Sequence, residues 1–389
     1  MQRLFTFTRR MLAAASICLA ASPAFSQVVK PNPQIAVNPR PEHAGSFTMV
    51  LVPDPQSYTK FTGNQPLFDL QTAWIAENID NLNIMAALVT GDMVEQNNKL
   101  TNLGVPHPHN GNLTSRQQWE GASHAFSYLD GKLPYILAQG NHDVGTVAAE
   151  SRHSMQPEFF YPERNPAWET CLVATAPDWR GIHTMENAAY EFAAPAWGRI
   201  LVIAFEFAPR DETLDWARSL IESERFRNDR VIILTHSMLH ADNRFVESER
   251  YQLTPRNWPR QVWDKLIAPS KNIDLVLCGH TGTPPAMPGN PTGLSDIDYG
   301  SNSAFRIEPA ADGRPVPVMM FNSQTGDGEW NGNGGDCWLR LLEFLPDGET
   351  ISVRTFSPLF AQSKLTGHLA WRDSPDDRFT FKVPRNSAE

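Results

Sequence analysis

Positive charge and cysteine are both scarce in this sequence. The 389 residues include 33 Lys and Arg against 43 Asp and Glu, a formal net charge of −10. This balance argues against a nucleic-acid polymer as partner, because such binding depends on counterion release by Lys and Arg. Of the four cysteines, Cys18 lies in the N-terminal segment, and the remaining odd number permits one disulfide. After that segment, no apolar run is long enough to anchor the protein in a membrane.

Several motifs of common enzyme classes are also missing. The sequence has no Gly-rich phosphate-binding fingerprint, no Gly-x-Ser-x-Gly elbow and no zinc-knuckle spacing. Residues 327–333 superficially suggest a calcium loop, but Trp338 stands where an EF-hand needs a bidentate Glu. What is present is an ordinary globular composition, with 41% hydrophobic and 20% charged residues, which is enough apolar material for a large core.

The N-terminal segment has the features of an export signal. Basic residues that include Arg9 and Arg10 precede the apolar run 11–21, and residues 24–26 offer a small-x-small cleavage site. Residues 8–12 also resemble a twin-arginine signal. We therefore expect residues 1–26 to be a signal peptide. The mature protein is then exported, to the periplasm or the medium, without a membrane anchor.

The rest of the chain is expected to form one large domain. We predict an extended Pro-rich leader over 27–45, the domain over 46–366 and a peripheral tail over 367–389. In an oxidising compartment Cys171 and Cys337 are the candidate disulfide pair, whereas Cys278 lies inside an apolar stretch and is expected to be an inert core thiol.

Five short apolar stretches each run into Asp, Asn or His, and each predicts a buried strand. They cover residues 47–52, 86–89, 135–138, 231–234 and 275–278. Ligands of open α/β sheets bind outside the carboxyl ends of the strands, so the polar residues that follow should converge on one cation. The residues that follow these strands are Asp54 and Gln56, then Asp92, then Asn141, His142 and Asp143, then His236, and then His280.

Helical and further strand patterns surround these stretches. Apolar spacing predicts helices over 66–82, 116–129, 211–223 and 258–267, and strands over 188–192, 200–207, 317–322, 338–344 and 351–356. Successive β-α-β crossovers imply sheets with parallel strands. The irregular region 144–186 has the length of a lid or binding loop.

In order along the chain, these blocks resemble the calcineurin-like metallophosphoesterases. The resemblance spans residues 47–283 and is carried by Asp54-x-Gln56, Gly91-Asp92-x-x-Glu95, Gly140-Asn141-His142-Asp143, His236 and Gly279-His280. It implies an α/β fold, a four-layer αββα sandwich with mixed sheets. It also implies two metal ions at the strand ends and hydrolysis of phosphomonoesters, phosphodiesters or pyrophosphates.

The resemblance also implies roles for single residues. Asp92 corresponds to the carboxylate that bridges both ions, and Asp54 to a ligand of one of them. Asn141, His236 and His280 correspond to the other ligands of the second ion. His142 corresponds to the general acid or transition-state cation, and Asp143 is expected to fix its tautomer.

Two departures from the family pattern fall on the Asp54 ion. Gln56 stands where the family has His, and Gly282 stands where the family has the second His of Gly-His-x-His. A neutral amide oxygen is a weaker ligand than imidazole for transition metals. We therefore expect one tight and one weaker site for divalent ions, with Mn, Fe, Zn, Mg and Ca all open. His107, His109, His183 and His240 are the candidate replacements.

Taken singly, each site residue has a simpler explanation. An Asp after a strand is often a helix N-cap, and a lone His is more often structural. Glu95 is expected to support the ligands or to lie at the start of a helix rather than to bind an ion. Together they predict an exported metal-dependent phosphoesterase acting on a small phosphoester. The alternative is a metal-retaining, non-catalytic binding protein on the same fold. The intact residues 141–143 favour the enzyme, whereas Gln56 and Gly282 favour the alternative.

Overall fold

Two sheets of seven strands each form the centre of this computed structural model, which describes residues 37–99, 111–281, 302–324 and 332–384. The first sheet has the order β13-β12-β11-β1-β2-β3, and β14 also pairs with β12. Its strands are β1 (Phe47–Val52), β2 (Ile84–Val89), β3 (Tyr135–Leu137), β11 (Leu339–Phe344), β12 (Thr350–Phe356), β13 (Trp371–Arg372) and β14 (Arg378–Lys382).

The second sheet has the order β4-β5-β6-β7-β8-β10-β9. Its strands are β4 (Leu172–Pro177), β5 (His183–Ala194), β6 (Gly198–Ala204), β7 (Arg230–Leu234), β8 (Ile273–Cys278), β9 (Asn302–Pro309) and β10 (Pro315–Asn322). Both sheets are mixed. The strands β1, β2 and β3 are parallel, as are β6, β7, β8 and β10, while the outer neighbours run antiparallel. All five strands predicted to carry site residues belong to these parallel sets.

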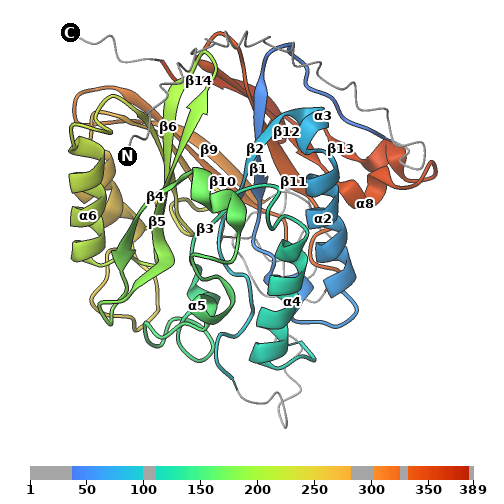
Figure 1. The fold of residues 1–389 in the computed structure, drawn as a ribbon, viewed down its shortest axis with the longest axis horizontal. Helices are drawn as coiled ribbons and strands as arrows, with labels where there is room; N and C mark the ends of the chain where they lie inside the picture. The colour runs from blue at the N-terminus through green and yellow to red at the C-terminus, as the bar shows by residue number, and fades with distance from the viewer. Residues whose placement is uncertain (1–36, 100–110, 282–301, 325–331, 385–389) are drawn as a thin grey trace, which may run out of the picture. The chain divides into compact units, whose positions relative to one another are not determined.

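Helices cover the outer face of each sheet (Figure 1). The first sheet packs against α2 (Gln65–Glu77) and α4 (Ser115–Ser127), and the ring of Trp74 lies 4.9 Å from Phe356 of β12. The second sheet packs against α6 (Asp211–Glu222) and the π-helical turn η4 (Trp263–Ile267) through one apolar cluster. A larger cluster takes residues from both sheets and fills the space between them. The predicted four-layer αββα sandwich with mixed sheets is confirmed.

The remaining helices are short. They are α1 (Gln56–Thr59), α3 (Ile79–Leu82), η2 (Asn141–Asp143), α5 (Gln156–Phe159), η3 (Pro166–Thr170), α7 (Pro259–Val262), α8 (Pro358–Ala361) and η5 (Gly367–Leu369). The helix predicted over 66–82 is divided at Asn78, whose side-chain amide donates to the carbonyl of Trp74. Across the described residues, none of these helices combines the length and the apolar character needed to cross a membrane.

The segment expected to be a peripheral tail instead contributes two strands. β13 and β14 pair antiparallel with β12. Phe379 and Phe381 alternate along β14, and both rings lie 5.0 Å from the ring of Phe305 on β9. This alternation of aromatic residues is the strand signal that the polar composition of the segment obscured. Residues 1–36, which include the expected signal peptide, lie outside the described residues.

The predicted disulfide between Cys171 and Cys337 is wrong. Both are free and buried, as is Cys278. The Sγ of Cys171 faces the carbonyl of Ala167, and that of Cys337 faces the carbonyl of Leu67. Burial raises the pKa of Cys171 and of Cys278 to about 12, which keeps both thiols protonated and unreactive.

Candidate metal centre

The predicted site residues follow the carboxyl ends of β1, β2, β3, β7 and β8, where the chain turns sharply. Asp92 and His280 have positive φ angles of 53° and 68°, a conformation that Asp and His adopt more readily than most residues. Glycines allow the turns to approach one another closely. A Cβ at position 140 would lie 2.1 Å from Asp92 Oδ1, and one at position 279 would lie 2.2 Å from Asp54 Oδ1.

Three side chains converge around the Nε2 atom of His236. Asn141 Oδ1 lies 3.0 Å from it, His280 Nδ1 lies 3.0 Å from it and Asp92 Oδ2 lies 3.2 Å from it. Asp92, His236 and His280 each offer one ligand atom within 4.8 Å of the others. The structure therefore brings together the whole set expected for the tight site.

Hydrogen bonds on the outer side of both imidazoles show that this set fits a cation. His236 Nδ1 lies 2.8 Å from the carbonyl oxygen of Thr90, and His280 Nε2 lies 2.8 Å from Glu249 Oε2. Both oxygens accept, so these outer nitrogens carry the ring hydrogens. The inner nitrogens of the neutral rings then point lone pairs at each other across 3.0 Å, beside a carboxylate. Such an arrangement is repulsive unless a positive charge lies among these atoms, either a proton on His236 or a metal ion. Two imidazoles, a carboxylate and an amide oxygen suit a divalent transition metal.

The electrostatics of the centre also favour a cation. Burial lowers the pKa of His236, but the carboxylates of Asp92 and Asp54 outweigh burial and raise it to about 10. Burial raises the pKa of Asp92, yet the neighbouring His236 and His142 bring it down to about 2. For Asp143, burial and then the charge of Asp92 raise the pKa well above its usual range. Buried acids at this density stabilise a positive charge between them.

Asp54 and Gln56 lie beside this set but make different contacts. Asp54 Oδ1 accepts from the Thr90 hydroxyl at 2.6 Å, and its Oδ2 accepts from the backbone N of His280 at 2.8 Å and from Asn322 Nδ2 at 3.0 Å. Gln56 Nε2 donates to Glu95 Oε2 at 3.4 Å, and Gln56 Oε1 is buried without a partner. Asp54 thus ties the turns after β2 and β8 to the last residue of β10.

Of the four candidate replacement histidines, the two that the structure describes do not join the centre. His183 and His240 are exposed, and neither belongs to the one group of three metal-binding side chains found among the described residues. His107, His109 and Gly282 lie outside those residues.

His142 is held by backbone contacts rather than by Asp143. Its backbone N donates to Asp92 Oδ1 at 2.9 Å, and its Nδ1 lies 2.7 Å from the carbonyl oxygen of Glu95. That carbonyl places the ring hydrogen on Nδ1. The Asp143 carboxylate instead accepts from the backbone N of Gly140 at 2.8 Å and of Val94 at 3.3 Å. The expectation that Asp143 fixes the tautomer of His142 is therefore wrong. Within the single turn of η2, consecutive side chains point in different directions, so Asp143 supports the loop.

Two residues that contact the histidines of the centre were not identified from the sequence. Glu249 holds the outer nitrogen of His280, and Phe207 packs its ring 5.8 Å from that of His236 and 6.2 Å from that of His280. Glu249 lies in a segment without periodicity, and Phe207 is the last residue of the strand predicted over 200–207, beyond the observed end of β6 at Ala204. Only the fold brings them to the centre, so sequence pattern carries no signal for either.

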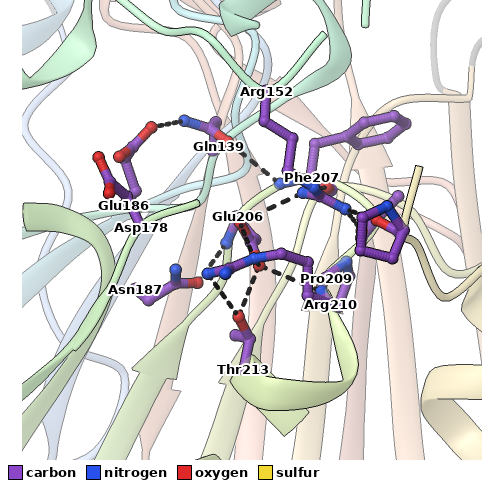
Figure 2. Close-up of polar contacts among 12 residues, drawn as sticks. Gln139, Arg152, Asp178, Glu186, Asn187, Glu206, Phe207, Pro209, Arg210 and Thr213 are labelled. Carbon is purple, nitrogen blue, oxygen red and sulfur yellow. Dashed lines mark hydrogen bonds and ion pairs between the residues drawn. The ribbon is translucent and has the colours of Figure 1, made fainter. Parts of the chain in front are cut away.

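A buried polar network connects the loop after β3 to the second sheet (Figure 2). Gln139, which precedes that loop, donates from its Nε2 to Glu186 Oε1 on β5 at 2.7 Å. Glu206 accepts from Arg210 Nε at 2.9 Å and lies 3.2 Å from Arg152 Nη1. Arg152 also donates to the carbonyl of Phe207. Through Arg152, the region 144–186 therefore helps to hold Phe207, whose ring packs beside His236 and His280.

Comparison with known proteins agrees with this geometry. The model of a family described as calcineurin-like phosphoesterase matches residues 55–284. Over 315 residues the chain is 23% identical to an uncharacterized protein, YvnB, of Bacillus subtilis, a match that covers 80% of this chain but only 20% of that protein.

Two solved structures also resemble the chain. GAP50, described as the anchor in the inner membrane complex of Plasmodium, has a TM-score of 0.43 at 12% identity, with 88% of this chain and 90% of that chain covered. A structure of PhoD has a TM-score of 0.40 at 11% identity, with 90% and 72% covered. Both TM-scores lie below 0.5, so neither structure bears on the activity of this chain.

Proposed function

Because the chain belongs to the calcineurin-like phosphoesterase family, we propose that it is an exported, metal-dependent hydrolase of small phosphomonoesters or phosphodiesters. The observation that carries this proposal is the set of lone pairs at Asp92, Asn141, His236 and His280, which converge as a divalent ion requires. When bound, such an ion supplies an acidified water and a Lewis acid for a phosphoryl oxygen.

Side chains of the protein itself would position the reacting groups, exchange the proton and shield the histidines. His142 is placed by Asp92 and Glu95, and its tautomer leaves Nε2 as the nitrogen that exchanges a proton. In its protonated form this nitrogen donates to the leaving oxygen or stabilises the charge that develops on the phosphoryl group. Phe207 shields the two imidazoles on one side. Asp143 keeps the loop that presents His142 in place through two backbone hydrogen bonds.

The test is hydrolysis by the purified mature protein after removal of bound metal. p-Nitrophenyl phosphate and bis-p-nitrophenyl phosphate are supplied with Mn²⁺, Zn²⁺, Fe²⁺, Mg²⁺ or Ca²⁺ in turn. We expect one of these ions to restore turnover and a chelator to abolish it. The His236→Ala variant is the control, because it removes the central ligand and should be inactive with every ion. A protein that binds metal but hydrolyses neither ester, nor other small phosphoesters, would favour the non-catalytic alternative.

A further inference from the structure

The family resemblance predicts a second ion beside Asp54 and Gln56, here named the second position, and the residues found there do not fit one. We propose that the chain holds a single divalent ion, and that its own hydrogen-bond donors and the ammonium group of Lys60 take the place of the second. This inference rests on the proposed function, since it concerns the composition of the same centre. Three observations support it.

The first observation is that Asp54 is already engaged. A carboxylate has about four lone-pair sites. On Asp54 a hydroxyl, a backbone N–H and an amide N–H take up three of them, at 2.6, 2.8 and 3.0 Å. These donors belong to Thr90, His280 and Asn322, at the ends of three different strands. One lone-pair site, on Oδ1, therefore remains, so Asp54 could offer a second ion only a single contact unless it gave up those that hold the His280 turn in its positive-φ conformation.

The second observation is a buried positive charge at the second position. Lys60 is only 1% exposed, and its Nζ lies 3.1 Å from Glu95 Oε2. Gln56 Nε2 donates to the same oxygen at 3.4 Å. Gln56 begins α1 and Lys60 directly follows its last residue as the C-cap, four positions on, so both reach the same side. A divalent ion bound by Gln56 would therefore lie close to an ammonium group, which repels it in a poorly solvated environment.

The third observation is the shortage of remaining ligands. Gln56 Oε1 is buried and unpartnered, but a single neutral amide oxygen does not hold a divalent ion. In the sequence, the family's second imidazole is replaced by Gly282, which has no side chain. Among the described residues, the single group of three metal-binding side chains is the one at Asp92, His236 and His280. In place of a second ion, the ammonium group of Lys60 contacts the Glu95 carboxylate beside Gln56.

The test counts the ions directly and does not depend on activity. The metal-free mature protein is loaded with Mn²⁺, passed through a desalting column and measured by elemental analysis and electron paramagnetic resonance. We expect one Mn²⁺ per chain and the six-line spectrum of an isolated ion. Two ions per chain, or the exchange-coupled spectrum of a Mn²⁺ pair, would overturn the inference and leave the proposed function standing. Loss of all Mn²⁺ would instead refute the tight site on which the proposed function depends.

A double variant tests the role of Lys60. In Lys60→Met/Gln56→His the ammonium is absent, Glu95 has lost its partner and an imidazole is added, so we expect a second Mn²⁺ to bind. Lys132→Met is the matched control, because it removes the same charge from an exposed site and should stay at one ion. A double variant that folds, as judged by circular dichroism, but still binds one ion would remove Lys60 from the explanation. If it does not fold, the ion count and spectrum of the unmodified protein still decide the inference.

Discussion

The Glu249→Gln substitution tests whether the outer hydrogen bond of His280 sets the strength of the metal centre. Glu249 Oε2 lies 2.8 Å from His280 Nε2, and Ser237 Oγ donates to the other carboxylate oxygen at 2.8 Å. The Glu249 side chain is only 8% exposed, so solvent screens this contact little. A carboxylate in this position fixes the ring and makes its inner nitrogen a better electron donor. Glutamine keeps the size of the side chain and removes the negative charge.

We expect the substitution to weaken metal affinity by about 10- to 100-fold, the usual effect of removing such a partner. This range corresponds to about 1.4–2.7 kcal/mol of binding free energy. The lower end applies if the amide oxygen still accepts from His280 Nε2, and the upper end applies if the ring also loses its orientation.

The measurement is competition for Zn²⁺ against a chelator of known affinity, at constant pH and ionic strength. Glu247→Gln is the matched control, because it removes the same charge from an exposed residue of the same segment and should leave affinity within about twofold. An affinity for Glu249→Gln equal to that of the control would refute the reasoning, since the hydrogen bond would then contribute nothing to metal binding.

Three further predictions follow from other parts of the chain. His142→Asn should lower kcat by about 10²- to 10⁴-fold at unchanged metal content, because His142 acts on the proton and is not a ligand; loss of metal would make it a ligand instead. Burial raises the pKa of Glu186 from 4.5 to about 7, so its contribution to stability is full below about pH 4.5 and is lost as the pH rises to about 7. Glu186→Gln mimics the protonated form and should raise the urea-unfolding free energy at pH 8 by up to roughly 3 kcal/mol, with no gain at pH 4; an equal change at both pH values would contradict this. Arg9→Lys/Arg10→Lys should block export if the signal is of the twin-arginine type, and normal export in a fractionation assay would indicate the ordinary secretory route.

Apolar periodicity and strand punctuation were enough to predict most of the architecture. β1 was predicted at its observed bounds, and α4 and α6 were predicted to within two residues at each end. The reason is that each of these helices buries one continuous face and β1 is buried entirely. Such burial is visible in the local spacing of apolar residues. β14 was missed because its polar residues hide two alternating phenylalanines, and its pairing with β12 depends on residues far away in the chain.

The residues of the candidate metal centre also divide into those that the local sequence pattern indicates and those that only the fold brings into place. Asp92, Asn141, His236 and His280 could be predicted because each follows a strand, and parallel strands place their carboxyl ends at one edge of a sheet. The sequence by itself therefore determined the fold class and indicated the four side chains that the structure brings together. Only the tertiary structure decided which groups hold the side chains in and around the site: Glu249 behind His280, the Glu95 carbonyl behind His142, and the donors around Asp54. These contacts join segments that are distant in sequence, so their distances and orientations exist only once the two sheets have packed together.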